Sequence, residues 1–450
     1  MPKTKRQSAR YLAMTTLENI KNGAYSNLQL NAVIKKNDLN QTDVKLFTTL
    51  VYGVIQHRLT LEYWLQPFVK QPQKMQPWIR ELLYTALFQM KFLDKVPIHA
   101  IFDETIEVAK LRGHEGQRRF VTGVLHQIKR QGVPATSAIT NDLDRLAIEA
   151  SLPKWLVDEL VAQIGLEKTQ KIAATINQAP SQSVRVNPVL ADKTTITTEL
   201  ESAGFEVAPS PIAKDGLLVK GGFVAGTLAF QRGAITLQDE SAMLVAEAMH
   251  IDQPSYQVLD TCAAPGGKTT QIASYLTPQA GGKVFAYDIH AHKVNLVAQN
   301  AARLGVAECV DALVGDARQL TTTYAPQTFD RVLVDAPCSG FGLLRRKPEI
   351  RYEKQMCDSL NLQKIQLAIL EEIADLVKIG GLLTYSTCTI LKTENDDVIA
   401  EFLAKHPDYQ LVPTKTDYDV ITNQTAKALT IYPDDFNSDG FFIASLKRLA

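Results

Sequence analysis

Residues 257–274 read QVLDTCAAPGGKTTQIAS, and the rest of the chain is arranged around this stretch. The apolar pair at 258–259 predicts a buried strand, and residues 269–276 predict the start of a helix. Between them lies a predicted turn that contains two adjacent glycines, Gly266 and Gly267. A strand, a glycine turn and a helix together present backbone N–H groups to a ligand. The alternative is an ordinary strand-to-helix turn in an α/β domain.

The turn does not match two common nucleotide-binding motifs. A phosphate-binding P-loop requires a glycine where this chain has Cys262, and the dinucleotide pattern Gly-x-Gly-x-x-Gly is also absent. A nucleoside cofactor without a pyrophosphate remains, and S-adenosylmethionine fits because its amino-acid end can lie on the turn. The residues expected to bind this cofactor are Cys262, Ala263, Ala264, Pro265, Gly266, Gly267 and Lys268.

The composition of the 450-residue chain is ordinary for a soluble protein, with 45% hydrophobic and 21% charged residues. No apolar stretch approaches the ~20 residues that span a bilayer, and the basic N-terminus lacks an apolar signal core. Five cysteines, an odd number, favour reduced thiols, and no Cys-x-x-Cys or His-rich spacing indicates a metal. We therefore expect a cytoplasmic monomer that binds neither a membrane nor a metal.

Residues 1–133 combine helical periodicity with positive charge. Leu12, Met14, Leu17 and Ile20 recur at helical spacing, and no strand alternation interrupts the segment, which predicts a helical bundle. The segment has 20 Lys and Arg against 10 Asp and Glu, a net charge of +10, whereas the remainder carries −10. Such a basic module suggests a polyanionic partner, most often a nucleic acid; a solvated helix surface is the alternative.

Residues 141–237 predict a small α+β module after a linker at 132–140. Helical segments at 155–165 and 168–177 precede four short predicted strands at 183–187, 205–207, 217–219 and 234–237, with a helix at 195–203. Arg185 and Asn187 lie two apart on one strand and so face the same side. They could hold RNA or the active site of the next domain, or form a surface salt bridge.

Residues 238–450 alternate strand and helix, which predicts a mostly parallel sheet covered by helices on both faces. The predicted strands are 258–260, 284–288, 311–314, 331–335, 382–386 and 441–446, and the predicted helices are 241–249, 268–276, 292–304, 363–377 and 395–405. The last strand follows an irregular segment, 418–440, and could be antiparallel. Ligands of such sheets bind outside the carboxyl ends of the strands.

Four carboxylates lie at or just past predicted strand ends: Asp260, Asp288, Asp316 and Asp335. Asp288 follows the second strand, where a carboxylate can accept from a ribose diol. Asp316 would lie beside the adenine amine. Asp also caps helices, but four at one sheet edge favour a ligand rim.

Two cysteines stand at strand ends on the same edge: Cys338 in DAPCSG (335–340) and Cys388 in YSTCT (385–389). Carbon 5 of a pyrimidine is a weak nucleophile, but a thiolate that adds to carbon 6 activates it for methylation. Asp335 could protonate ring nitrogen 3 during this addition, and Lys268 could orient Asp335 or lower a thiol pKa. We expect Cys262, Cys309 and Cys357 to serve packing.

These motifs now carry a resemblance. CAAPGGK (262–268), DAPCSG and YSTCT, in this order, resemble the RNA cytosine-5 methyltransferases of the Sun family, as do RRKPEIR (345–351) and DGFF (439–442). The likeness covers about residues 140–450. In addition, VPIHA (96–100) and FVTGVL (120–125) resemble the NusB-like RNA-binding domain.

The resemblance implies which thiol attacks, a choice that spacing alone leaves open. In the Sun family the cysteine of the Thr-Cys motif is the nucleophile, here Cys388, and the Pro-Cys cysteine, here Cys338, assists product release. DNA cytosine methyltransferases use the Pro-Cys thiol instead.

The implied architecture is a NusB-like helical bundle (1–133), a small α+β module (141–237) and a Rossmann-like S-adenosylmethionine-dependent methyltransferase domain (238–450). The implied activity is methylation of carbon 5 of a cytosine in 16S ribosomal RNA of the small subunit, through a covalent cysteine–carbon 6 adduct. Residues 1–133 and 345–347 would contact phosphates. The alternatives are the same chemistry on transfer RNA, and a non-catalytic RNA-binding or antitermination factor.

Overall fold

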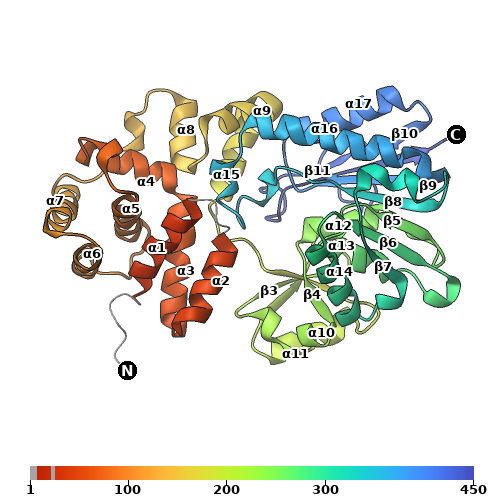
Figure 1. Ribbon diagram of the computed structural model, residues 1–450, viewed down its shortest axis with the longest axis horizontal. Coiled ribbons are helices and arrows are strands. Elements are labelled where there is room, and N and C mark those ends of the chain that lie inside the picture. The colour runs from red at the N-terminus through yellow and green to blue at the C-terminus, as the bar shows by residue number, and fades with distance from the viewer. Residues whose placement is uncertain (1–7, 22–25) are drawn as a thin grey trace. The chain divides into compact units, whose positions relative to one another are not determined.

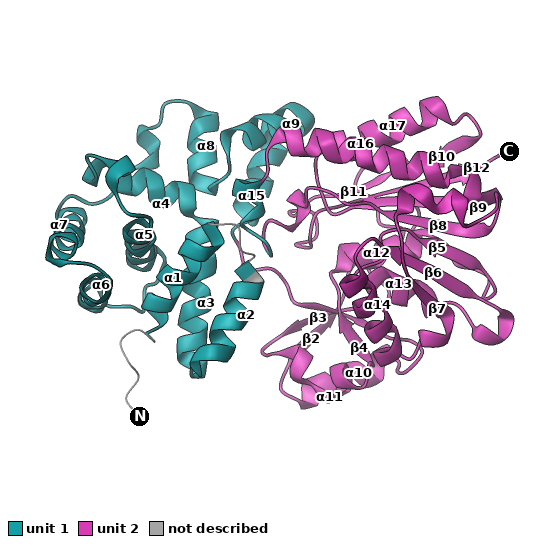
Figure 2. Ribbon diagram, viewed as in Figure 1, with its two compact units in different colours: residues 1–177, 346–353 teal, residues 178–345, 354–450 magenta. Residues whose placement is uncertain are grey.

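The computed structural model describes residues 8–21 and 26–450. The chain divides into two compact units: residues 1–177 with 346–353, and residues 178–345 with 354–450 (Figure 2). The short segment 346–353 thus belongs to the first unit, although it lies far along the sequence. The helices expected after residue 141 also belong to the first unit, whereas their place in the sequence suggested the middle module.

The first unit is a helical bundle, as predicted for its N-terminal part (Figure 1). Its helices are α1 (Ala9–Lys21), α2 (Ser26–Asn37), α3 (Gln41–Gln56), α4 (Arg58–Leu65), α5 (Pro77–Phe92), α6 (Ile98–Arg112), α7 (Glu115–Gln131), α8 (Asp142–Ala150), α9 (Lys154–Thr175) and α15 (Ile350–Glu353). Leu12, Met14, Leu17 and Ile20 are all buried in one core, so the periodicity located this face of α1 correctly. None of the described helices has both the length and the apolar character that a membrane span requires.

A four-stranded antiparallel sheet begins the second unit. Its strands are β1 (Ser183–Val186), β2 (Glu206–Pro209), β3 (Gly216–Lys220) and β4 (Ile235–Leu237), in the order β2-β3-β1-β4. The helices α10 (Lys193–Ser202) and α11 (Leu228–Gln231) accompany the sheet. Its small core includes Val184, Ile196 and Leu217. The predicted α+β module is therefore confirmed.

The larger sheet has eight strands: β5 (Gln257–Asp260), β6 (Lys283–Asp288), β7 (Val310–Val314), β8 (Phe329–Asp335), β9 (Val377–Thr387), β10 (Tyr409–Val412), β11 (Leu429–Ile431) and β12 (Phe441–Arg448). The order is β10-β12-β9-β8-β5-β6-β7, and β11 pairs with β12. Strands β5 to β9 are parallel, and β12 runs antiparallel to β9, as the irregular segment before it suggested.

Helices cover both faces of this sheet (Figure 1). One face carries α12 (Glu240–Ala248), α13 (Gly267–Ala273) and α14 (Ala291–Arg303), and the other carries α16 (Met356–Ile373) and α17 (Asp396–Lys405). Alternate strand residues enter different cores: Val258 packs with the first set and Leu259 with the second. A strand that is buried on both faces reads as a short apolar run, which is why the sequence revealed it.

Candidate active site

A cleft of about 420 Å³ opens where the strand order of the large sheet reverses. From β5 the chain proceeds outward through β6 and β7 and then returns to β8, which pairs with the other edge of β5. Open α/β sheets bind their ligands at such a reversal, outside the carboxyl ends of the strands. The cleft brings together most of the predicted site residues: Cys262, Ala264, Asp288, Asp316, Asp335, Cys338 and Cys388.

The glycine turn borders this cleft, and its first glycine has a strict backbone requirement. Gly266 has φ +102°, and a Cβ atom there would lie 3.1 Å from Val297 Cα of α14. Gly267 has no comparable neighbour. Cys262 and Ala264 line the cleft, Ala263 is buried in the core beside it, and the Pro265 carbonyl accepts a hydrogen bond from Asn300. The turn is therefore packed against α14.

Asp260 does not belong to the ligand rim that its position at a strand end predicted. Its side chain is buried, and its Oδ2 accepts a 2.7 Å hydrogen bond from Thr269 Oγ1 in α13. Burial raises the pKa of Asp260 to about 7. The residue ties the end of β5 to α13 from beneath, so that it supports the turn without facing the ligand.

Lys268 forms an ion pair with Asp335, which lines the cleft. Lys268 Nζ lies 2.7 Å from Asp335 Oδ2, and Ser386 Oγ donates to Asp335 Oδ1 at 2.8 Å. Lys268 Nζ also lies 4.7 Å from the centre of the Phe441 ring. Burial alone would lower the pKa of Lys268, but the Asp335 carboxylate outweighs it and raises the net pKa. Lys268 thus carries its charge next to the carboxylate.

The two cysteine sulfurs are neighbours. Cys338 Sγ and Cys388 Sγ lie 3.2 Å apart, and neither residue forms a disulfide. The hydrogen bond with Cys388 and burial raise the pKa of Cys338 well above its usual range. Burial raises the pKa of Cys262 to about 12, which suits a neutral packing thiol. Of the three thiols in the cleft, Cys338 and Cys388 can share one proton.

Two further carboxylates line the other end of the cleft. Asp288 Oδ1 accepts from the His290 N–H at 2.9 Å, next to the exposed side chain of Ile289. Asp316 accepts from the Arg318 guanidinium and also caps the 3₁₀ helix η8 (Ala317–Thr322) through the Arg318 N–H. Hydrogen bonding from Arg318 lowers the pKa of Asp316. Asp316 is thus both a cap and a cleft residue, two roles that the sequence presented as alternatives.

Arg185 and Asn187 hold the helices of the site in place. Arg185 Nη1 donates to the Gly267 carbonyl at 2.9 Å, and its Nη2 donates to Thr270 Oγ1 at 3.1 Å. Asn187 Nδ2 donates to the Leu304 carbonyl at the end of α14. Both side chains are buried, which excludes the surface salt bridge considered as an alternative.

Some residues differ from their predicted roles or had no sequence signal. Arg345 was expected to contact phosphate, but it is buried and donates to Asn437 Oδ1 and the Ser438 carbonyl. Cys357 was expected to be packed, but it is exposed on α16. Ile365 and Ile369 of the same helix line the cleft, and nothing in their spacing distinguished them from core residues.

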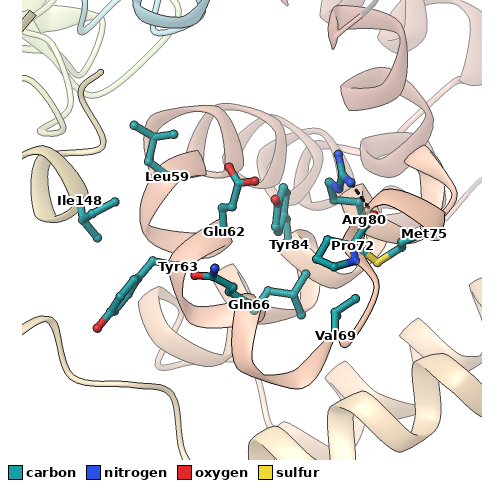
Figure 3. A pocket seen from close by; sticks show the side chains of 11 residues that line it. Leu59, Glu62, Tyr63, Gln66, Val69, Pro72, Met75, Arg80, Tyr84 and Ile148 are labelled. Atoms are coloured by element: carbon teal, nitrogen blue, oxygen red, sulfur yellow. Dashed lines mark hydrogen bonds between the residues drawn. The ribbon is translucent and has the colours of Figure 1, made fainter. Parts of the chain in front are cut away.

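The first unit has its own cavities. A groove of about 750 Å³ runs along α7 and the segment before α5, and its described lining contains Lys70, Lys74, His114 and Arg119 but no Asp or Glu. Phe120 is partly exposed in it. A smaller cavity of about 310 Å³, lined by Tyr63, Met75 and Tyr84 among others, is largely apolar (Figure 3).

Comparison with known proteins finds three family matches along the chain, and the middle one crosses the boundary between the two units at residue 177. Residues 249–447 match the 16S rRNA methyltransferase RsmB/F family, residues 7–130 match the NusB family, and residues 152–224 match a ferredoxin-like domain of RsmF/B-like methyltransferases. A "Probable ribosomal RNA small subunit methyltransferase B" of Bacillus subtilis (strain 168) is 44% identical, over 99% of each chain. A protein of the same name from Synechocystis sp. (strain ATCC 27184 / PCC 6803 / Kazusa) is 33% identical, over 98% of this chain and 99% of its own.

Solved structures agree with the sequence relatives. The crystal structure of PH0851 covers 98% of this chain and 99% of its own, with a TM-score of 0.83 and 26% identity. A methyltransferase homologue from Pyrococcus horikoshii covers 69% of this chain and 100% of its own, with a TM-score of 0.59 and 26% identity. Because relatives with at least 33% identity match almost the whole chain, this protein belongs to the RsmB/F family of 16S ribosomal RNA methyltransferases.

Proposed function

We propose that this methyltransferase transfers a methyl group from S-adenosylmethionine to carbon 5 of a cytosine in 16S ribosomal RNA, through a covalent bond between Cys388 Sγ and carbon 6. The observation that carries the proposal is the 3.2 Å separation of two cysteine sulfurs beside the Lys268–Asp335 ion pair. Methylation of an atom that is already nucleophilic needs no thiol. A pair of thiols with a carboxylate fits a reaction that must first activate a carbon and then release it.

The residues of the cleft fit the cofactor. A volume of about 420 Å³ lies in the range of small-molecule sites, which is roughly 300–1,000 Å³. Asp288 supplies a carboxylate for ribose hydroxyls, exposed Ile289 an apolar surface for the base, and Asp316 an acceptor for its amine. When bound there, S-adenosylmethionine supplies the electrophilic methyl group that carbon 5 takes up.

The first covalent step needs a thiolate, and the pKa of Cys338 supports Cys388 in this role. The Cys338 thiol keeps its proton and can donate it in a hydrogen bond to the Cys388 sulfur, which stabilises Cys388 as the thiolate. Cys388 Sγ then bonds to carbon 6, and the electron pair of the carbon 5–carbon 6 double bond becomes available at carbon 5. Asp335 in its protonated form donates its proton to ring nitrogen 3 as the sulfur adds, and the Lys268 ammonium, 2.7 Å from Asp335 Oδ2, stabilises the carboxylate that this leaves.

The release step reverses the roles of the thiols. The largest causes of the raised pKa of Cys338 are its hydrogen bond to Cys388 and burial, followed by the charge of Cys388. The two contributions from Cys388 disappear once the Cys388 sulfur is bonded to carbon, so that Cys338 ionises more easily. Cys338 gives its thiol proton to solvent and can then accept the proton of carbon 5; the carbon 5–carbon 6 double bond re-forms, nitrogen 3 returns its proton to Asp335, and Cys388 leaves as a thiolate.

Two features of the first unit support RNA as its partner. Residues 1–133 carry a net charge of +10. The groove along α7 combines the cationic side chains of Lys70, Lys74 and Arg119 with Phe120, a partly exposed ring on which a base can stack. Lys347 is exposed and remains a candidate phosphate contact, whereas Arg345 does not.

The test is transfer of radiolabelled methyl groups to unmodified 16S ribosomal RNA and to unmodified transfer RNA, followed by nucleoside analysis. We expect label in 5-methylcytidine from the ribosomal RNA. Label confined to transfer RNA would redirect the proposal to that substrate, and label in another nucleoside would contradict the cytosine-5 chemistry. Binding of RNA without any transfer would favour a non-catalytic RNA-binding factor.

A further inference from the structure

Cys338 and Cys388 lie just past the ends of strands β8 and β9, outside the hydrogen-bonded part of the sheet. Strand β8 ends at Asp335 and β9 at Thr387; the last pair between these two strands is Asp335 with Ser386, and Thr387 still pairs with Phe442 of β12. Cys338 and Cys388 follow on irregular backbone, where no ladder of strand hydrogen bonds fixes them. A separation of 3.2 Å between their sulfurs therefore requires other contacts.

The loop that carries Cys338 is held by Glu394 on both sides of the cysteine. Glu394 Oε2 accepts from the Ser339 N–H at 2.9 Å and from Gln366 Nε2 at 3.1 Å. Gln366 Nε2 in turn donates to the Pro337 carbonyl at 2.9 Å. The residues before and after Cys338 are thus tied, directly or through one amide, to a single carboxylate oxygen.

The loop that carries Cys388 is held in the same way by the next residue, Asn395. Thr387 Oγ1 donates to Asn395 Oδ1 at 2.6 Å, and Asn395 Nδ2 donates to the Thr389 carbonyl at 3.1 Å. A hydrogen bond of 2.8 Å between Ser339 Oγ and Thr389 Oγ1 joins the two loops directly. Two consecutive residues just before α17 therefore hold the flanks of both cysteines.

The position of Glu394 is costly for a residue whose only role is stability. The side chain is 0% exposed, and no described residue donates a hydrogen bond to its Oε1. A buried carboxylate with an unsatisfied oxygen is unfavourable, so its presence calls for an explanation other than stability. The oxygen that does accept hydrogen bonds, Oε2, contacts the loop that carries Cys338. The positioning of this loop therefore explains why Glu394 is buried here.

We propose that Glu394 is a positioning residue that holds the Cys338 sulfur against the sulfur of Cys388, so that Cys338 can act in the release step. The inference rests on the proposed two-thiol cycle. Glu394 itself touches neither the base nor the cofactor in this scheme; it acts through Ser339 and Gln366. We expect the negative charge of Glu394 to matter less than the length of its side chain, because both hydrogen bonds depend on where one acceptor oxygen lies.

Two substitutions of Glu394 distinguish the effect of its side-chain length from the effect of its negative charge. Glu394→Gln keeps the length of the side chain and an oxygen that can accept from Ser339 and Gln366, but it removes the charge. Glu394→Asp keeps the charge and shortens the reach by one methylene. We expect Glu394→Asp to lower kcat about 10- to 100-fold with KM for RNA unchanged within about twofold, and Glu394→Gln to stay close to the unmodified enzyme. Thermal unfolding and cofactor binding by calorimetry check that both variants are folded.

The decisive readout is epistasis with Cys338→Ala. In the otherwise unmodified enzyme, Glu394→Asp should accumulate a protein–RNA adduct, as a failure of release predicts. In the Cys338→Ala background, the same change should add nothing, because the side chain that it positions is already absent. A general loss of structure would instead lower activity further in both backgrounds.

The inference and the proposed function fail in different ways. If Cys338→Ala itself accumulates no adduct, the two-thiol cycle is wrong. If Cys338→Ala accumulates adduct but Glu394→Asp does not, or if Asp preserves turnover and Gln abolishes it, the positioning role is overturned. Should Glu394→Asp be unfolded, Gln366→Leu, which removes the amide that links Glu394 Oε2 to the Pro337 carbonyl, is expected to show a smaller accumulation of the same adduct; its absence would also overturn the inference.

Discussion

At the scale of single residues, Asp335 is held in one orientation by two neighbours. One carboxylate oxygen accepts from Lys268 and the other from Ser386, so the side chain is held from two sides. Such a fixed carboxylate can meet a ring nitrogen without first losing freedom of rotation. The sequence offered an interaction with Asp335 as one of two roles for Lys268, and the fold places the two side chains 2.7 Å apart.

Asp335→Asn should slow formation of the covalent adduct about 10²- to 10⁴-fold, because an amide cannot pass a proton to nitrogen 3. The rate is measured by rapid mixing with RNA and denaturing electrophoresis. Ser386→Ala is the matched control, since it removes one hydrogen bond of Asp335 and leaves the carboxylate and Lys268 in place. Equal effects of the two substitutions would mean that Asp335 orients neighbours and does not transfer a proton.

At the scale of elements, the turn before α13 depends on the backbone of Gly266. A side chain there would adopt an unfavourable φ and approach the backbone of α14. Gly281 offers a comparison, since it has φ +83° but a Cβ atom there would meet no other atom within 4 Å. The two glycines thus share the conformational requirement and differ in the packing requirement.

Gly266→Ala should destabilise the protein by about 1–3 kcal/mol more than the same change at Gly281, and it should weaken S-adenosylmethionine binding. Gly281→Ala should cost roughly 1 kcal/mol and leave the affinity unchanged. Urea unfolding and calorimetry measure these effects. Similar losses of stability at both positions would show that α14 can move away and that the turn is not packed tightly.

The elements of the large sheet were predictable where burial on both faces left a short apolar run. The sequence predicted β5 to β9 and β12 but missed β10 and β11, which lie at or beside the edge of the sheet and include polar residues such as Gln410 and Thr430. It started α16 at residue 363, whereas the helix begins at Met356 after a capping box between Gln355 and Asp358. The early turns of α16 carry too many polar residues for periodicity to reveal them.

The sequence motifs predicted the residues that line the candidate site, but not the residues that hold their loops in place. Residues next to a glycine turn or at strand ends stand out in a sequence because their types are unusual for those places. Glu394 and Asn395 do not, because a carboxylate and an amide at the start of a helix resemble ordinary caps. The contact of Glu394 with Ser339, which lies 55 residues away in the sequence, forms only after folding.

At the scale of the whole molecule, the basic first unit is expected to supply much of the affinity for RNA. Lys70→Glu with Lys74→Glu should weaken RNA binding, because the groove would gain negative charge, and should make the affinity less dependent on salt. Lys35→Glu with Lys36→Glu changes the net charge equally on α2 and is the matched control. Binding isotherms at several salt concentrations measure both. Equal weakening by the two pairs would indicate a general charge effect without a specific groove.

The proposed two-thiol mechanism requires that Cys388, and not Cys338, bonds to carbon 6. The measurement is the amount of protein–RNA adduct that survives denaturing electrophoresis for Cys338→Ala and for Cys388→Ala, with mass spectrometry of the linked peptide. Cys338→Ala should accumulate adduct through Cys388, and Cys388→Ala should form none. Adduct trapped by Cys388→Ala and absent from Cys338→Ala would contradict the assignment and make Cys338 the nucleophile.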